Sequence, residues 1–386
     1  MRSVPLVLLF LAAALSGIAA APQADFDRVR RQAEAARSAE QIAEAIRLYR
    51  ESVRLRPSWS EGWWWLGSLY YEQDRFPEAQ SALRRFVTMD PKPGPAYAFL
   101  ALCEYETRDY SRALEHFQQW ARQGSPGTDA LIDVAGFHWA LLLTREGRFV
   151  QALYLLSAKA QRRGHSPALA EAMGLASLRM ATLPEDYPPE KRESVWLAGE
   201  AAFYASLRPQ AFDRSDDYAR RLLFHYGQEP NVHFFRGTLL VFQKKRDAAK
   251  EEFEQELRKS PQHAPALVEL ARLSMEDRQF GEAESFARHA LQTDSKDPMA
   301  HLLLGRTLLA QERLPESARE LETASQLAPD SAAVRFQLAT AYRKLGRNQE
   351  AQREFAVFAS LKNKPEVLIS PEEFEEMLRT QPEKPQ

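Results

Sequence analysis

The sequence of 386 residues is poor in several features on which catalysis or covalent stabilisation depends. Its single cysteine, Cys103, excludes any disulfide within the chain, and its net charge of −2 gives no support for general nucleic-acid binding. It contains no phosphate loop ending in Gly-Lys-Ser/Thr, no Gly-x-Gly-x-x-Gly fingerprint and no His-Glu-x-x-His zinc motif. The sequence therefore predicts no catalytic residue, no cofactor and no metal site, and indicates a protein that is not an enzyme.

Clusters of potential metal ligands are also scarce. The eight histidines are scattered, and His225 and His233, which flank one loop, are a weak signal because structural zinc normally has four ligands. Acidic pairs such as Glu372-Glu373 are interpreted as exposed helix faces. Cys103 is predicted to be a small packing residue, since free cysteines are among the most buried residue types, although a lone thiol can also pair with another chain.

Long apolar runs are confined to the N-terminus. Residues 1–20 carry a positive charge at Arg2, an apolar run from Leu6 to Leu15, and small residues up to Ala20. This is the pattern of a secretory signal peptide, and the run is shorter than the about 20 residues that a spanning helix needs. We expect export to the bacterial periplasm or beyond, with no integral membrane segment after cleavage. The alternative is an uncleaved anchor in the inner membrane.

What the sequence does contain is a repeat of 34 residues. The sharpest copy reads Trp63-x2-Leu66-Gly67-x2-Tyr70, followed by Ala79, Leu83 and Pro91. One slot in each of six copies holds alanine, at Ala45, Ala79, Ala113, Ala249, Ala283 and Ala351, and the copy before the last has Ser317 there. Proline closes four copies, at Pro57, Pro91, Pro261 and Pro329. The agreement of several slots over seven copies makes chance an inadequate explanation.

Each slot has a physical meaning. Apolar residues at steps of three and four predict two short amphipathic helices per repeat. Small residues such as Gly67, Gly237 and Gly305 let the helices approach closely, and proline ends the second helix because it lacks the backbone N–H. One such hairpin cannot bury its apolar face alone, so neighbouring hairpins must stack. The fold class predicted is all-α.

The register divides the chain into blocks. The N-terminal block, 21–180, holds repeats at 26–59, 60–93, 94–127 and about 133–166, followed by a helix at 167–180. The stretch 181–229 is irregular, because Pro184, Pro188 and Pro189 exclude a helix around them, and two helices follow near 190–207 and 215–226. The C-terminal block, 230–365, holds repeats at 230–263, 264–297, 298–331 and 332–365. The irregular stretch is expected to bend the array or to divide it into two stacks.

The last residues, 366–386, are predicted to form a capping helix and a disordered tail. Ser370-Pro371-Glu372-Glu373 is an N-terminal helix signal, and Phe374, Met377 and Leu378 form a narrow apolar stripe. Such a helix, polar on its other side, would cover the apolar face that the last repeat leaves exposed.

These slots resemble those of the tetratricopeptide repeat family over roughly 26–166 and 230–365. More loosely, the chain is similar to exported, uncharacterised repeat proteins of soil bacteria. The resemblance implies a right-handed α-solenoid of about eight to nine helix pairs. First helices line its concave face, where such proteins bind extended peptides or partner domains. The asparagines of the family's carboxylate clamp are absent, since Trp65, Ser68, Phe99 and Leu102 stand in the matching slots.

The family register assigns groove-facing positions, which we take as the candidate partner-binding residues: Trp64, Tyr71, Tyr105, Phe234, Arg272, Arg306, Phe336 and Arg343. Arg272 and Arg306 hold the same slot in successive repeats, so we hypothesise that they and Arg343 bind carboxylates of an acidic ligand. The alternative is that these arginines pair with acidic neighbours such as Glu269 and Glu276. Trp64 is either a hot spot for a partner or a packing residue against the preceding repeat.

Two functions remain open at this point. The first is an exported scaffold, without catalytic activity, that holds a partner protein or extended peptide in the groove. The alternative is a docking subunit of an envelope-assembly or polysaccharide-export complex. The sequence does not predict the identity of the partner or the oligomeric state.

Overall fold

The chain forms helices throughout the part that is described. The computed structural model describes residues 7–207 and 210–362, with side chains from residue 23 onwards. These ranges contain 19 α-helices, one short 3-10 turn and no strand, so the all-α prediction is confirmed. The chain divides into two compact units, Met1–Leu143 (unit 1) and Thr144–Gln386 (unit 2), and each is described by itself.

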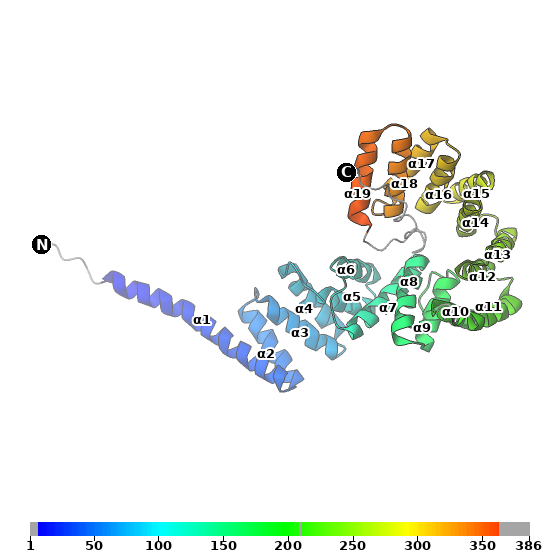
Figure 1. Cartoon of the computed structure of the whole chain (residues 1–386). Helices are drawn as coiled ribbons and strands as arrows, with labels where there is room; N and C mark the ends of the chain where they lie inside the picture. The colour runs from blue at the N-terminus through cyan, green and yellow to red at the C-terminus, as the bar shows by residue number, and fades with distance from the viewer. Residues whose placement is uncertain (1–6, 208–209, 363–386) are drawn as a thin grey trace. The chain divides into compact units, whose positions relative to one another are not determined.

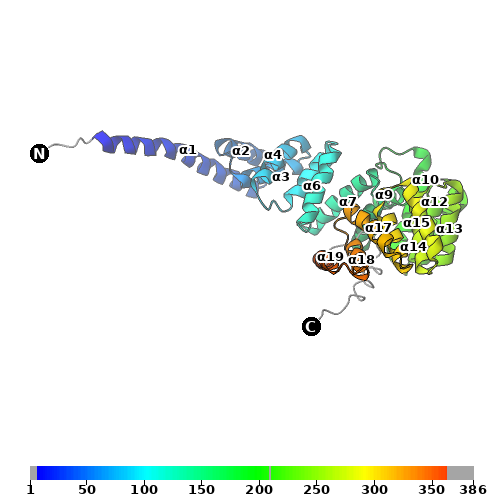
Figure 2. The same cartoon turned by 90° about the horizontal axis from the view of Figure 1, so that it is seen from above.

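Unit 1 holds three helix pairs and most of a seventh helix. Its helices are α1 (Val7–Ser38), α2 (Ile42–Leu55), α3 (Ser60–Glu72), α4 (Phe76–Met89), α5 (Ala96–Glu106), α6 (Tyr110–Arg122) and α7 (Asp129–Arg145), the last of which crosses into unit 2. Helices α1 to α6 pack as α1 on α2, α3 on α4 and α5 on α6, and each pair contacts the next. Figures 1 and 2 show these pairs stacked one after another.

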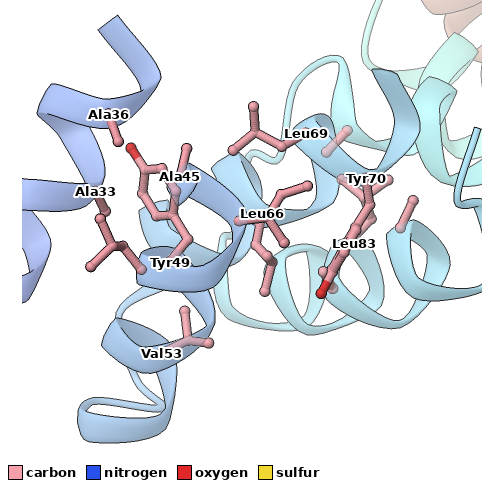
Figure 3. Packing of buried hydrophobic residues seen from close by; sticks show 14 of the residues in the cluster. Ala33, Ala36, Ala45, Tyr49, Val53, Leu66, Leu69, Tyr70 and Leu83 are labelled. Carbon is pink, nitrogen blue, oxygen red and sulfur yellow. The ribbon is translucent and has the colours of Figure 1, made fainter. Parts of the chain in front are cut away.

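Helix α1 is longer than its partner. Its N-terminal part extends beyond α2 (Figures 1 and 2), and burial begins at Phe26, the first residue of the first predicted repeat. Tyr49 of α2 lies against Ala33 and Ala36 of α1 (Figure 3), and Arg37 donates a hydrogen bond of 3.2 Å to its hydroxyl. The first predicted hairpin is thus packed as the repeat pattern requires.

Unit 2 continues with further helix pairs. Its helices after α7 are α8 (Phe149–Arg163), α9 (Pro167–Ser177), the 3-10 turn η1 (Pro189–Lys191), α10 (Arg192–Ser206), α11 (Phe212–Tyr226), α12 (Val232–Phe242), α13 (Arg246–Lys259), α14 (Ala264–Glu276), α15 (Phe280–Thr293), α16 (Pro298–Ala310), α17 (Leu314–Leu327), α18 (Ala332–Lys344) and α19 (Asn348–Leu361). From α12 onwards each odd helix packs on the even helix before it, and each pair packs on the next.

The small-residue slots allow close helix approach, as predicted. The six alanines of the second-helix series are buried, and Ser317, in the same slot, donates a 2.7 Å hydrogen bond to the carbonyl of Gly305. A Cβ on Gly67 would stand 2.7 Å from Leu83, and Gly237 and Gly305 face Phe253 and Leu321 in the same way. Small residues recur every 34 residues because each hairpin needs them where its two helices touch.

The turns within repeats share a backbone feature that the sequence analysis did not anticipate. A residue with positive φ recurs between first and second helices, at Glu40, Asp74, Arg108, Gly147, Lys244, Arg278, Glu312 and Gly346. Six of the eight carry a side chain, although the left-handed region favours glycine. The surrounding hairpin therefore imposes this conformation.

The irregular stretch forms a loop within a helix pair of unit 2. The insertion lies between α9 and α10, and α10 packs on both α9 and α11. The predicted helices at 167–180, 190–207 and 215–226 correspond to α9, α10 and α11. The block boundaries proposed from sequence remain predictions, and the division between compact units falls at Leu143–Thr144 instead of at the insertion.

Three further expectations concern single features. Cys103 is buried, and burial raises the pKa of its thiol to about 12, which supports the packing interpretation. The predicted cap and tail, 366–386, lie outside the described residues. Within the ranges that are described, no helix combines the length and the apolar character that crossing a bilayer requires.

Candidate functional site

Side chains from first helices of unit 1 form an aromatic surface that contains two groups of contacting rings. It comprises Trp64 and Tyr71 of α3, Phe99 and Tyr105 of α5, and His138 of α7, and we call it the unit 1 aromatic surface. The ring of Phe99 lies 5.7 Å from Trp64 and 5.0 Å from Tyr71, and the rings of Tyr105 and His138 are 4.7 Å apart. All five side chains are half-buried, so each presents part of its ring to solvent.

The three consecutive tryptophans contact different partners. Trp64 packs on Phe86 of α4, 5.5 Å away, and on Phe99 of the following repeat. The guanidinium of Arg37 lies 3.7 Å over the ring of Trp65, which therefore provides the contact with the preceding repeat. Trp63 donates a 2.8 Å hydrogen bond to the carbonyl of Pro57. Trp64 joins the aromatic surface through Phe99, and the ring of Trp65 lies 6.4 Å from that of Trp64.

A buried polar network fixes α5 beneath this surface. Glu104, next to Tyr105, is fully buried and accepts hydrogen bonds from Arg84 of α4 at 3.0 Å and from His116 of α6 at 2.6 Å. Because a buried carboxylate is costly without partners, this network holds α5 in one position against both neighbours. Burial also raises the pKa of the Tyr71 hydroxyl, which keeps this part of the surface uncharged at neutral pH.

The two phenylalanines among the candidate partner-binding residues of unit 2 differ in exposure. Phe234 of α12 is half-buried and lies 5.7 Å from Phe253 and 5.0 Å from the imidazole of His263. Phe336 of α18 is only 9% exposed and packs between Phe355 and Phe358 of α19. The structure therefore leaves Phe234 available to a ligand and places Phe336 largely in the core of its own hairpin.

The three arginines predicted to bind an acidic ligand differ in exposure and in their partners. Arg272 donates to Glu269 at 2.6 Å and to Glu276 at 2.7 Å, which is the pairing that the alternative interpretation expected. Arg306 is half-buried on α16, beside α14, in the slot that matches Arg272. Arg343 is exposed, and its guanidinium lies 5.5 Å from the ring of Phe355. Arg272 could bind an acidic ligand only in competition with its own two glutamates.

One basic residue near these positions was missed by the sequence analysis. Arg179 lies in the loop after α9, outside the 34-residue register, and its guanidinium stands 4.7 Å from the ring of Phe149 and 5.5 Å from that of Phe234. Neither periodicity nor a motif marks this position, because the contact joins elements that are far apart in sequence.

Most of the described histidines contact other protein groups. His233 and His301, in the same slot two repeats apart, pair with Glu252 at 2.6 Å and Glu320 at 2.8 Å. The ring of His225 lies edge-on to that of Phe224, 5.0 Å away, and is tilted against that of Tyr226, 6.2 Å away. Over the part of the chain that the structure describes, no group of three His, Cys, Asp or Glu side chains is arranged to hold a metal ion.

Family profiles match the N-terminal and the C-terminal part of the repeat array. One tetratricopeptide repeat profile matches residues 30–92 and 66–128, and a second matches 242–307 and 308–367. The chain belongs to the tetratricopeptide repeat family. Between the two matched regions lie α7 to α11, most of α12 and the loop that carries Arg179. No curated protein matches the chain.

Solved structures of other tetratricopeptide repeat proteins are similar to parts or to most of this chain. MamA from Desulfovibrio magneticus RS-1 is 17% identical and covers 44% of this chain and 95% of its own, with a TM-score of 0.39. YrrB, described as a TPR protein with an unusual peptide-binding site, is 16% identical and covers 46% and 92%, with a TM-score of 0.37. Yeast Tom70 is 12% identical and covers 92% and 95%, with a TM-score of 0.32. At these values the structures carry no argument about function.

Proposed function

We propose that this tetratricopeptide repeat protein is a scaffold, without catalytic activity, that binds a partner protein or extended peptide through its first helices. The observation that carries the proposal is the unit 1 aromatic surface. Its rings come from successive first helices, and each remains half-exposed although the same residue types are buried elsewhere in the unit. Tryptophan and tyrosine in partly desolvated positions are enriched among residues that dominate binding energy.

The rigidity of the surface supports the same function. Rings that already contact one another lose little conformational freedom when a ligand covers them, so more of the contact energy appears as affinity. The network around Glu104 adds to this by fixing α5, which supplies two of the five side chains. An extended peptide lying across α3, α5 and α7 would contact one or two rings on each helix.

Export is a second part of the proposal. It rests on residues 1–20, whose charged start, apolar run and small residues have the order of a signal peptide. Mass measurement of the mature N-terminus tests it. A chain that begins after Ala19 or Ala20 supports export with cleavage, whereas a chain that retains residues 1–20 after fractionation supports the anchored alternative.

The experiment for binding is affinity capture from the cell envelope with three baits: the wild-type chain and two matched variants. A variant carrying Tyr71→Ala and Tyr105→Ala should lose the partners that the wild-type chain retains, while Tyr154→Ala, which removes a 63% exposed tyrosine of α8, should keep them. Capture of pore or synthase components would assign the scaffold to an envelope-assembly or polysaccharide-export complex. Identical partners with all three baits would contradict a role for the aromatic surface.

A further inference from the structure

Three aromatic side chains form a row on α10 and α11, which pack side by side in unit 2 (Figure 1). The ring of Tyr218 lies 5.5 Å from that of Trp196, at 90°, and 5.8 Å from that of Tyr204, nearly parallel at 7°. We call these three residues the unit 2 aromatic row. They lie outside the regions that the family profiles match, where the 34-residue register is irregular and marks no groove position.

The row is the exposed part of a helix that is otherwise largely buried. Trp196 is 42% exposed and Tyr204 is half-buried, whereas the residues on either side of each in the chain are buried. Trp196, Glu200 and Tyr204 follow one another at steps of four, so they share one face of α10. Glu200 is itself buried and forms a 2.7 Å hydrogen bond with His165. Contacting rings left partly in water on such a helix indicate an interaction surface.

The polar tips of these rings are unused within the described residues. There, neither the indole N–H of Trp196 nor the hydroxyl of Tyr204 or Tyr218 forms a hydrogen bond with another group. By contrast, the hydroxyl of Tyr226, at the end of α11, donates to Glu193 at 2.7 Å. The unit 2 aromatic row therefore offers three neutral donors together with its apolar surface.

The charges around the row nearly balance. The charged groups beside it are three carboxylates and two guanidiniums, those of Asp213, Asp217, Glu200, Arg214 and Arg221. Burial, followed by the charge of Glu200, raises the pKa of Tyr218, so its hydroxyl keeps its proton at neutral pH. Because neither sign is in large excess, the surroundings favour an uncharged ligand over a strongly acidic or strongly basic one.

The dimensions of the row fit a polyproline II segment. Such a segment has no internal hydrogen bonds, so its carbonyls are free, and it rises about 9 Å in each turn of three residues. The ring centres of Trp196 and Tyr204 are no more than about 11 Å apart, so the two ends of the row match residues one turn apart. The three donors can then bind carbonyls of the segment while its proline rings pack on the aromatic ones.

A sugar is the other uncharged ligand that packs on aromatic rings. It places a C–H face on one ring and carries hydroxyls around its edge. Because Trp196 and Tyr218 stand at 90°, a sugar stacked on either ring would turn hydroxyls towards the apolar surface of the other, which costs free energy. The methylene groups of a proline ring present no polar atom to either surface. The perpendicular pair therefore favours proline.

We propose that the unit 2 aromatic row binds a proline-rich segment of a partner protein in the polyproline II conformation. Proline rings fill the corner between Trp196 and Tyr218, and carbonyls of the segment accept hydrogen bonds from the indole N–H and the two hydroxyls. Polyproline II is already rigid, so little conformational entropy is lost on binding. The site is separate from the unit 1 aromatic surface, and the inference does not rest on the function proposed for that surface.

Fluorescence anisotropy of a labelled decaproline peptide tests the proposal on the full chain. The wild-type protein should bind decaproline saturably and should not bind a Gly-Ser peptide of equal length. Trp196→Ala should weaken decaproline binding at least about tenfold, because an aromatic anchor is lost. Tyr218→Phe keeps the ring and removes one donor, so it should weaken binding about two- to tenfold. Phe224→Ala removes an aromatic side chain of α11 that is 85% exposed and should leave binding unchanged.

Tyr218→Phe keeps the test valid if Trp196→Ala disturbs α10, because it removes a single oxygen atom. Absence of saturation up to about 1 mM decaproline would overturn the proposal. Equal binding of the Gly-Ser peptide, or unchanged decaproline binding in both row variants, would overturn it too. Binding of cellohexaose in place of decaproline, abolished by Trp196→Ala, would assign the row to a sugar instead. A wild-type dimer that Trp196→Ala dissociates and decaproline does not would assign it to a second copy of the chain.

Discussion

The carbonyl oxygen of Val195 on α10 lies against the α-carbon of Gly174 on α9, where no side chain could fit. Gly199 meets the carbonyl of Ala170 in the same way, so α9 and α10 cross with their backbones in contact. Gly174→Ala should therefore force the helices apart and lower the free energy of unfolding by about 1–3 kcal/mol, measured by urea denaturation.

Gly281 provides the control for that substitution. It lies in the first turn of α15, and a Cβ there would meet no atom within 4 Å. Gly281→Ala should leave stability unchanged or raise it by up to about 1 kcal/mol, since alanine has the higher helix propensity. Equal effects of the two substitutions would show that the α9–α10 crossing is not tightly packed.

Glu256 joins α13 to the start of α12. Its fully buried carboxylate accepts from the backbone amides of Asn231 at 2.9 Å and Phe234 at 3.2 Å, which belong to the first turn of α12 and have no partner within that helix. Glu256→Gln should cost about 2 kcal/mol, because charge-assisted hydrogen bonds are replaced by neutral ones. Glu251→Gln, on the exposed side of α13, is the control and should have little effect. A difference below the error of urea denaturation would argue against this role.

Two histidines should give stability opposite dependences on pH. Burial lowers the pKa of His263 below 6.5, and its neutral ring contacts Asn231 at 2.8 Å and accepts from the amide of Ala266. The unfolded chain therefore binds a proton that folded His263 resists, so this contribution is present above pH 6.5 and is lost as the pH falls below it. The hydrogen bond to Glu320 raises the pKa of His301, so its contribution is complete below pH 6.5 and is lost as the pH rises through the folded value.

Urea midpoints between pH 5 and pH 8 separate these two effects. His263→Asn should reduce the loss of stability on the acid side, and His301→Asn should reduce the loss on the alkaline side. Parallel curves for both variants and the wild-type chain would contradict the assignments.

The fold was largely predictable because stacking imposes a local rule. Each hairpin must place small residues where its helices come close together. The spacing of Gly67, Gly305 and the alanine series in the sequence therefore predicts where the helices pack. The positive-φ turn residues were not predictable in the same way. Side chains as different as those of Asp74, Arg278 and Glu312 occupy that position, and the conformation is imposed by the hairpin that encloses it.

The contacts of the candidate binding residues could be predicted from the sequence for some residues and not for others. The neighbours of Arg272 stand three and four positions away on one helix, so its ion pairs could be inferred from spacing. The burial of Phe336 depends on Phe355 and Phe358 of the partner helix, which slot position alone does not reveal. Arg179 lies outside the register, and its surroundings come from three other elements, so only the folded chain shows them.

The central claim, that the unit 1 aromatic surface binds a protein partner, is tested most directly by site-specific photo-crosslinking in cells that produce the protein. A photoreactive phenylalanine analogue would replace Tyr71, Tyr105 or, as the control, Tyr154. The account predicts a discrete crosslinked protein from positions 71 and 105 and none from position 154. Crosslinks from position 154 alone, or equal yields from all three positions, would contradict it.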